Sequence, residues 1–441
     1  MILNGGTVLD PSMKVHEVMD ILITDDRIEK VGPGLSTQFP EEEAFDCTDL
    51  WIMPGLVDMH THLREPGYEY KETIRTGTQA AAAGGFTTIA CMANTLPVND
   101  NPSVTRYIRE KADEEGLIEV LPIGAATKGL KGEQLAEIGL MRETGIVALS
   151  DDGFPIRDAE ILRLVLEYAR RFDLPVIDHC EDLSTSRGGV VHEGKMGTRM
   201  GLRGIPCVSE SSVVARDILM AQWLKVPIHI AHVSCKASID LIRWAKTQGI
   251  PVTCEVTPHH LALTFDDLFL SKYDTNFKVN PPLREEEDRK ALLNALKEGI
   301  IDCIATDHAP HDTQSKMVEF DYASNGISGL ETALPLILEV GNEAGISPLN
   351  ILSKMTIEPA RILGVERGTL TPGSLANLTI FDPDETWVVN PQEFFSKGKN
   401  TPFAGRSLTG RVKATFYHGK AVFLDKKNPW GLTPICTRKP S

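Results

Sequence analysis

The chain has 441 residues, of which 42% are hydrophobic, and a formal net charge of −16. This length can bury one large core of roughly 250 residues, as in an α/β barrel, and a smaller unit besides. The acidic balance argues against a general affinity for nucleic acid or for acidic membranes, so neither is expected as a partner.

The cysteines and the apolar segments point to a cytoplasmic protein. The first residues lack the basic start and long apolar run of a secretory signal, and no apolar stretch approaches the length of a membrane span. The eight cysteines are scattered and form no Cys-x-x-Cys motif: Cys47, Cys91, Cys180, Cys207, Cys235, Cys254, Cys303 and Cys436. A disulfide framework is therefore not expected, and a reducing compartment is.

The two ends of the chain share a β-rich texture, with short strand-like runs separated by turn residues. The strand-like runs are residues 7–10, 20–23, 27–31, 378–381 and 413–417. His418-Gly419 is expected to be a turn. We predict that residues 1–54 and 366–441 form one composite β-rich domain.

Residues 55–365 alternate strand-like and helix-like segments. Residues 159–171, for example, carry apolar side chains at helical spacing. Together with the run that ends at His62, the strand-like segments number eight; the other seven are residues 87–93, 118–123, 145–149, 174–178, 226–231, 250–255 and 300–305. This alternation predicts an α/β fold of the (β/α)8 TIM-barrel type. A doubly wound sheet is the alternative, but it leaves unexplained why polar residues follow so many of the strands.

The first of these strands leads into the segment Asp58-Met59-His60-Thr61-His62 from an apolar run at residues 50–57, read as one buried strand. Alternate side chains of an extended chain share a face, so His60 and His62 can bind one metal ion while Asp58 orients one of the imidazoles.

Further metal-ligand types stand at the ends of the later strands. They are Asn94, Asp151, Asp152, His179, His232, Asp307 and His308, with His311 shortly after the last strand. In a barrel these ends surround one mouth, and histidines with carboxylates suit zinc, as one ion or two. His229 lies in the middle of a strand and is expected to be structural. His259 and His260 are expected to support the site or the fold.

Asp58–Gly67, Ser150-Asp151-Asp152-Gly153 and Asp307–His311 resemble the signatures of the dihydroorotases, in the cyclic amidohydrolase superfamily. The resemblance implies reversible, zinc-dependent cyclisation of N-carbamoyl-L-aspartate to dihydroorotate in de novo pyrimidine (UMP) biosynthesis. It also implies two zinc ions more readily than one. Many relatives bridge their metals with a carboxylated lysine, but residues 145–153 contain no lysine, so a carboxylate must take its place.

The same resemblance implies roles for individual residues. His60 and His62 would hold one metal with Asp307, and His179 and His232 would hold the other. The bridging carboxylate is assigned to Asp152, with Asp151 as the alternative because spacing does not separate two neighbours. Asp307 would also accept the proton of the attacking water and pass it to the leaving nitrogen.

Arg64 follows the first ligands directly, where its guanidinium could bind a substrate carboxylate or pair with Asp58 or Glu65. The resemblance implies that Arg64, Asn94 and His311 hold the carboxylate of dihydroorotate, and that Asn280 contacts the pyrimidine ring.

Other functions are also compatible with the sequence. Allantoinases tend to carry Asn at the position of Arg64, and dihydropyrimidinases use the lysine that is missing here. A third alternative is a non-catalytic scaffold that assembles with aspartate transcarbamoylase, although such chains generally lose metal ligands. The resemblance implies aspartate transcarbamoylase as a candidate partner and a homodimer as the assembly.

Overall fold

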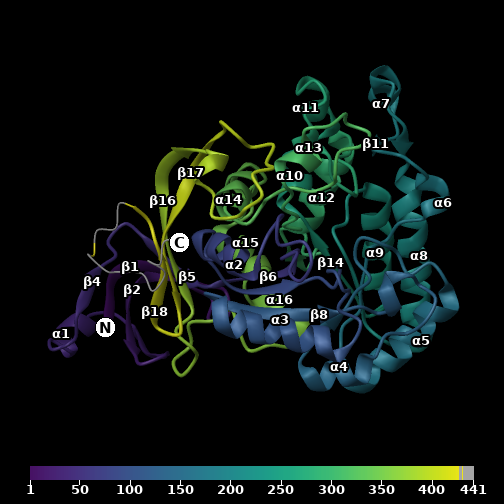
Figure 1. Ribbon diagram of the computed structural model, residues 1–441. Coiled ribbons are helices and arrows are strands. Elements are labelled where there is room, and N and C mark those ends of the chain that lie inside the picture. The colour runs from purple at the N-terminus through teal and green to yellow at the C-terminus, as the bar shows by residue number, and fades with distance from the viewer. Residues whose placement is uncertain (427–429, 431–441) are drawn as a thin grey trace.

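The computed structural model describes residues 1–426 and Trp430. Cys436 and the remaining end of the predicted C-terminal β-rich segment lie outside the described residues. A strand-rich end occupies the left of Figure 1, and helices surround a set of parallel strands on the right. None of the helices within residues 1–426 combines the length and the apolar composition needed to cross a bilayer.

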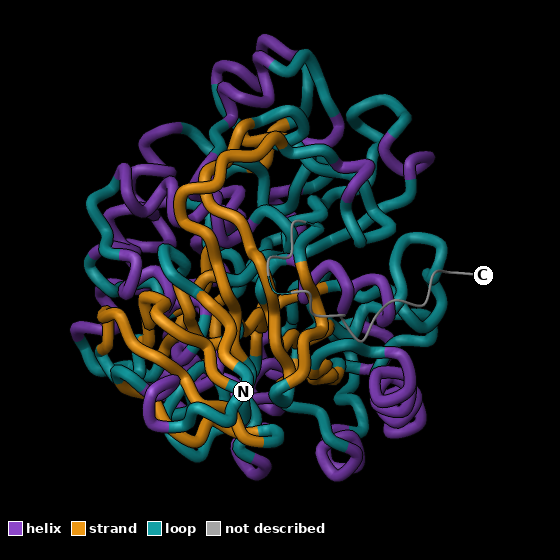
Figure 2. The backbone as a smooth tube through the Cα atoms, turned by 90° about the vertical axis from the view of Figure 1, so that its left-hand side faces the viewer, coloured by secondary structure: helices purple, strands orange, loops and turns teal. Residues whose placement is uncertain are grey.

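An eight-stranded sheet, here called the terminal sheet, combines strands from both ends of the chain and faces the viewer in Figure 2. Its order is β18–β17–β16–β5–β1–β2–β3, with β4 paired to β1. The strands are β1 (Ile2–Asp10), β2 (Val15–Thr24), β3 (Arg27–Gly32), β4 (Ala44–Asp46), β5 (Trp51–Pro54), β16 (Leu378–Val388), β17 (Ser407–Tyr417) and β18 (Lys420–Leu424). The two ends of the chain meet where β5 pairs antiparallel with β16, with Ile52 opposite Ile380.

The terminal sheet is stabilised by an apolar cluster of its own. Ile52 and Ile380 are fully buried in it, together with Phe416 of β17, which is 1% exposed. Full burial of one such side chain is worth about 1.5–3 kcal/mol. The expected turn at His418-Gly419 is confirmed, since it joins β17 to β18.

Eight further strands form two four-stranded parallel sheets, β6–β7–β8–β9 and β10–β13–β14–β15. They are β6 (Leu56–Thr61), β7 (Phe86–Cys91), β8 (Glu119–Gly124), β9 (Ala148–Leu149), β10 (Ile177–Asp178), β13 (Ile228–Ile230), β14 (Val252–Val256) and β15 (Cys303–Ile304). Isolated parallel bridges join Leu149 to Val176 and Thr61 to His308, so the two sheets contact each other at both edges.

Each of the eight predicted strand regions contains a strand, but several strands are shorter than predicted. Pro175, Pro227 and Pro251 stand just before β10, β13 and β14. Because proline has no N–H to donate to a ladder, the hydrogen-bonded strand begins after it. The run of apolar residues is therefore longer than the segment that forms hydrogen bonds to neighbouring strands.

The prediction of one buried strand over residues 50–57 is wrong. The run divides at Gly55: β5 joins the terminal sheet, whereas β6 joins the parallel strands. A Cβ atom on Gly55 would lie 2.2 Å from the Thr87 side chain, so the chain can pass there only as glycine. Both halves are apolar because both are buried, and hydrophobicity alone did not reveal the break.

A helix follows each parallel strand, which confirms the α/β class. The longer helices are α2 (Ile74–Ala83), α3 (Pro102–Glu115), α4 (Ile138–Thr144), α5 (Ala159–Ala169), α8 (Cys207–Leu224), α9 (Lys236–Thr247), α12 (Glu286–Lys297), α14 (Ala333–Glu343), α15 (Pro348–Met355) and α16 (Ile357–Leu363). The shorter ones are α1 (Leu35–Gln38), α6 (Leu183–Ser186), α7 (Lys195–Met200), α10 (Pro258–Ala262), α11 (Phe265–Leu270) and α13 (Thr313–Lys316), and the pair β11 (Val191–His192) and β12 (Gly204–Ile205) forms a separate small sheet.

Helix α5 illustrates how the sequence specifies these helices. Asp158 caps its N-terminus by accepting hydrogen bonds from the backbone N–H groups of Glu160 and Ile161. Leu162, Val165, Leu166 and Ala169 are its buried residues, at the spacing of one helical face. The predicted helix is confirmed as far as Ala169, and a 3-10 turn, Arg170–Phe172, continues it.

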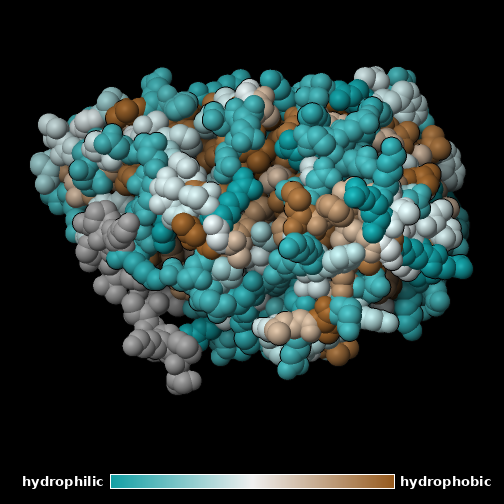
Figure 3. Space-filling model, turned by 90° about the horizontal axis from the view of Figure 1, so that it is seen from above, coloured by the Kyte–Doolittle hydropathy of each residue, from teal (hydrophilic) through white to brown (hydrophobic). Residues whose placement is uncertain are grey.

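The interior of the parallel strands is apolar along most of their length. One buried cluster combines residues of strands from both sheets: Met59, Ala90, Ile123, Ala148, Ile177 and Cys303. The predicted site residues lie at the carboxyl ends of these strands or in the segments that follow them. Seen from above, the surface is a mosaic of hydrophilic and hydrophobic residues (Figure 3).

Candidate metal and active site

All ten predicted site residues come together at the carboxyl ends of the parallel strands. Nine of them line a cavity of about 270 Å³: His62, Arg64, Asn94, Asp152, His179, His232, Asn280, Asp307 and His311. The tenth, His60, is fully buried beside Asp152 and Asp307. Residues up to 251 positions apart in the sequence therefore share one site.

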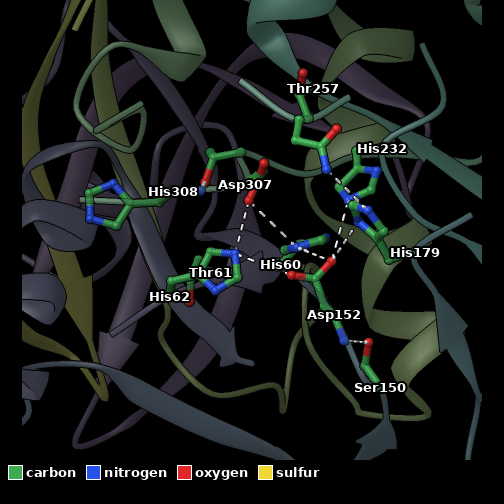
Figure 4. A network of polar contacts seen from close by, with 12 residues as sticks. His60, Thr61, His62, Ser150, Asp152, His179, His232, Thr257, Asp307 and His308 are labelled. Carbon is green, nitrogen blue, oxygen red and sulfur yellow. Dashed lines mark hydrogen bonds and ion pairs between the residues drawn. The ribbon is translucent and has the colours of Figure 1, made fainter. Parts of the chain in front are cut away.

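The Asp152 carboxylate lies among four imidazoles (Figure 4). Its Oδ1 atom is 3.4 Å from His60 Nε2, 3.5 Å from His179 Nδ1 and 3.3 Å from His232 Nε2. Its Oδ2 atom is 3.5 Å from His62 Nε2. One carboxylate thus faces imidazoles that follow or end strands of both parallel sheets.

The neighbouring carboxylate, Asp151, points elsewhere. It accepts a hydrogen bond of 2.9 Å from the backbone N–H of Thr127 and another from the Thr127 hydroxyl. Burial raises the pKa of Asp151 to about 6, although these hydrogen bonds oppose the rise. Of the two neighbours, Asp152 alone contacts the imidazoles.

Asp307 completes the cluster from the other side. Its Oδ1 atom lies 3.0 Å from His62 Nε2 and 3.6 Å from His60 Nε2. The backbone is left-handed at Asp307 (φ 47°), at His232 (φ 28°) and at Arg64 (φ 63°). Non-glycine residues adopt such angles at a cost and tend to do so where function requires it.

In three of the imidazoles, one ring nitrogen contacts a hydrogen-bond acceptor outside the cluster and the other ring nitrogen faces the cluster. The outer contacts are His60 Nδ1 to Glu255 Oε1 (2.6 Å), His62 Nδ1 to Asn94 Oδ1 (3.0 Å) and His179 Nε2 to Glu181 Oε2 (3.1 Å). Such contacts fix the tautomer and leave a lone pair on the inner nitrogen, as metal-binding histidines require.

The inner nitrogens fit a metal ion. His60 Nε2 is buried and has no hydrogen-bond partner. Ligand atoms of His60, His62 and Asp307 lie within 4.8 Å of one another, and so do those of His60, Asp152 and His232. Imidazole nitrogens with carboxylate oxygens are a donor set suited to zinc.

The charges of this cluster are strongly interdependent. Burial opposes protonation of His60, but Asp152 and Glu255 outweigh it and raise the pKa of His60 well above its ordinary value. Burial likewise opposes ionisation of Asp152, but His60, His179 and His232 lower the pKa of Asp152 well below its ordinary value. The carboxylates thus favour positive charge on the imidazoles, and a divalent cation can supply that charge in place of protons.

Glu255 and Glu181 are the site residues that the sequence analysis missed. Glu255 ends the seventh predicted strand, and Glu181 follows His179 by two positions, so the strand-end rule could have found both. The expected role of Asp58 is wrong: its carboxylate accepts from the backbone N–H of His60 at 3.0 Å and from the Thr306 hydroxyl at 2.5 Å. Glu255 orients the His60 imidazole instead.

The remaining histidines near the site serve other contacts. His308 turns away from the cluster (Figure 4), with Nε2 3.4 Å from Glu72 and Nδ1 accepting from the Gly329 N–H at 3.2 Å. His229 contacts Thr253 and Glu255, and His260 contacts Thr257 and the Pro281 carbonyl, as expected for structural residues. His259 is also buried, and its Nε2 has no hydrogen-bond partner.

The predicted substrate-binding residues line the mouth of the cavity. Arg64 Nε donates to the Pro310 carbonyl at 3.3 Å, and its Nη2 lies 3.4 Å from His311 Nε2. His311 Nε2 donates to the Asn325 carbonyl at 2.8 Å, while its Nδ1 is buried without a partner. Asn280 donates from Nδ2 to Glu181 Oε2 at 2.9 Å.

Comparison with known proteins agrees with this geometry. The dihydro-orotase-like family matches residues 50–238. A dihydroorotase of Geotalea daltonii is 50% identical over 420 residues, which are 95% of this chain and 98% of that protein. A dihydroorotase of Geobacter metallireducens is 48% identical over 96% of this chain and 99% of its own length.

Among solved structures, an L-hydantoinase (dihydropyrimidinase) from Arthrobacter aurescens is similar with a TM-score of 0.85 and 25% identity, covering 96% of this chain and 95% of that chain. A dihydropyrimidinase from Brevibacillus agri has a TM-score of 0.83 at 24% identity, over 96% of this chain and 95% of that chain, and so shares the fold. Identity near one half over almost the whole length decides the matter: the chain belongs to the dihydroorotase family.

Proposed function

We propose that this protein interconverts N-carbamoyl-L-aspartate and dihydroorotate, a step of de novo pyrimidine (UMP) biosynthesis. The observation that carries the proposal is one cavity in which four imidazoles and two carboxylates adjoin Arg64. A guanidinium at the mouth selects a substrate that bears a carboxylate beside the cyclic amide. The names of the relatives, dihydroorotase in each case cited, support the same reaction.

We further propose zinc as the cofactor, with two ions more suitable than one. His60, His62 and Asp307 would hold the first ion, His179 and His232 the second, and Asp152 would bridge them. The outer contacts of three imidazoles and the orphaned His60 Nε2 support this assignment. When bound, zinc lowers the pKa of water to about 7 and polarises a carbonyl group.

The other proposed roles of the chain's residues are proton transfer and substrate binding. In the hydrolytic direction Asp307 removes a proton from the attacking water and delivers it to the ring nitrogen as the amide bond breaks; cyclisation reverses these transfers. Contacts to His62 and His60 keep Asp307 an anion, since they lower the pKa of its carboxyl group despite its burial. Arg64, Asn94 and His311 would hold the substrate carboxylate, and Asn280 would contact the ring.

The finer architecture and assembly are part of the proposal. The two parallel sheets would make one (β/α)8 barrel over residues 55–365, an assignment supported by the bridges at both edges. Residues 1–54 and 366–441 would form the composite domain, supported by the pairing of β5 with β16. A cytoplasmic homodimer, with aspartate transcarbamoylase as a partner, follows from the family resemblance and is testable by sedimentation of the two proteins separately and mixed.

Turnover measurements distinguish the candidate substrates. The zinc-loaded protein should act on dihydroorotate and far less on allantoin or on dihydrouracil, which lack a carboxylate for Arg64. The Arg64→Met variant should raise KM for dihydroorotate about 10- to 100-fold, since a charge-assisted bidentate contact is lost. Preference for dihydrouracil, as the likeness to the hydantoinase structure would permit, would reject the proposal; zinc uptake without any turnover would favour the scaffold.

A further inference from the structure

A pair of cysteines lies outside the candidate active site, where α8 and α9 begin. Cys207 is the first residue of α8, and Cys235 is the N-cap residue of α9, which packs against α8 (Figure 1). Cys235 Sγ lies 3.8 Å from the Cys207 carbonyl oxygen, and each of the two thiols shifts the pKa of the other. Cys207 is half-buried and Cys235 is fully buried, and both are free thiols.

The surroundings of Cys207 favour its thiolate. Arg284 Nη1 donates to His192 Nδ1 at 3.2 Å, so His192 must carry its own proton on Nε2. The neighbouring Cys235 thiol has the largest effect in lowering the pKa of Cys207; His192 and the Arg284 charge also lower it, and burial opposes them. The N-terminus of the 18-residue helix α8 acts in the same direction.

The surroundings of Cys235, by contrast, favour its protonated thiol. Its Sγ lies 3.4 Å from Glu210 Oε1 and 3.2 Å from Ser238 Oγ. The contact with Cys207, burial and the Glu210 charge all raise the pKa of Cys235, which therefore stays protonated. A protonated thiol beside a carboxylate is placed to give up its proton to Glu210 when it attacks an oxidised neighbour.

We propose that Cys207 and Cys235 form a redox-active dithiol that a hydroperoxide oxidises to an intramolecular disulfide. The Cys207 thiolate attacks one peroxide oxygen: the S–O bond forms, the O–O bond breaks, sulfur loses two electrons and hydroxide leaves. Cys235 then attacks the Cys207 sulfur and passes its proton to Glu210. The S–S bond forms, the S–O bond breaks, and Glu210 passes the proton on to the departing oxygen, which leaves as water.

A metal site is the competing explanation for the same residues. His192, Cys207 and Asp288 each offer a ligand atom, all within 4.8 Å of one another. Arg284, however, is 3% exposed, occupies His192 Nδ1 and brings a buried guanidinium to this cluster. Arg284 Nη2 lies 3.6 Å from Glu210 Oε2, but the Arg284 charge still lowers the pKa of Cys207 and so stabilises its thiolate. Because Arg284 also occupies His192 Nδ1, the dithiol is favoured over a metal site.

Peptide mapping by mass spectrometry tests the proposal on the full-length, zinc-loaded protein. After brief treatment with equimolar hydrogen peroxide, the Cys207 and Cys235 peptides should be found linked, and a dithiol reductant should separate them. In Cys235→Ser, dimedone should trap a sulfenic acid on Cys207. In Cys207→Ser, peroxide consumption should fall about tenfold or more, whereas the matched control Cys47→Ser should behave as wild type.

Two results would overturn the dithiol assignment, and wild-type protein suffices for both if a variant does not fold. The first is accumulation of sulfinic acid on Cys207 with no linked peptide. The second is a zinc ion, retained after mild chelation in addition to the catalytic complement, that protects both thiols from peroxide. The second result would assign a metal site to His192, Cys207 and Asp288.

Discussion

The candidate active site and the terminal sheet both contain buried side chains, but these are ionisable in the first region and apolar in the second. In the active site the buried side chains are imidazoles and carboxylates that hold one another, around Asp152 and Asp307. In the terminal sheet they are apolar, and Phe416 packs with Ile52 and Ile380. Changes in the first region should therefore affect chemistry more than folding, and changes in the second should do the reverse.

The largest effect is expected for Asp307→Asn, which removes the proposed proton acceptor. The value of kcat should fall about 10³- to 10⁴-fold, the upper part of the range for loss of general acid–base catalysis, because Asp307 is also a proposed ligand. Steady-state kinetics measure the loss of kcat, and thermal unfolding measures any loss of stability. A Tm drop that accounts for the lost activity would remove the distinction between the regions.

The reverse case is Phe416→Ala in the terminal sheet. Loss of a fully buried aromatic side chain should lower the free energy of unfolding by about 3–5 kcal/mol. The value of kcat per folded molecule should stay at the wild-type level. Denaturant titration and active-site titration measure both quantities, and a specific loss of kcat would show that this sheet acts on the chemistry.

Asp152→Asn and Asp151→Asn form a matched pair within the active site. Asp152 contacts four imidazoles, so its substitution should weaken zinc binding by about a hundredfold or more, as measured by competition with a chelator. Asp151 bonds to Thr127 instead, so its substitution should leave the zinc content unchanged. Equal loss in both variants would contradict the assignment of the bridge.

The smallest effect concerns Lys316, which is 7% exposed and donates to the Thr275 and Ser324 carbonyls. Burial, then the Lys278 charge, lower the pKa of Lys316 to about 7. The unfolded chain binds this proton up to a pH of about 10, so the free energy of unfolding should rise between about pH 7 and pH 10.

The Lys316→Met variant should flatten that rise, by about 1.4 kcal/mol for each unit by which folding lowers the pKa of Lys316. Denaturant titrations of both proteins at neutral and at alkaline pH give the difference directly. An identical pH dependence in the two proteins would mean that Lys316 titrates normally in the folded state.

The sequence by itself determined the strand–helix order and the ten residues that line or adjoin the cavity. Most of these signals are local, whereas Asn280 was indicated only by the resemblance to the dihydroorotases. A run of apolar residues marks a buried strand, and the polar residue that follows it marks the strand end, where parallel strands place their functional groups. His60 and His62 share a face simply because alternate side chains of a strand do.

Only the tertiary structure decided which of two neighbouring carboxylates faces the imidazoles. Asp152 faces the imidazoles while Asp151 bonds to Thr127, and Glu255 rather than Asp58 holds His60. These choices depend on partners that are distant in the sequence, as does the break at Gly55, where the Thr87 side chain leaves no room for a Cβ atom. Spacing along the chain constrains the direction in which a side chain points. Contacts between distant segments arise from packing, and no single stretch of the sequence specifies them.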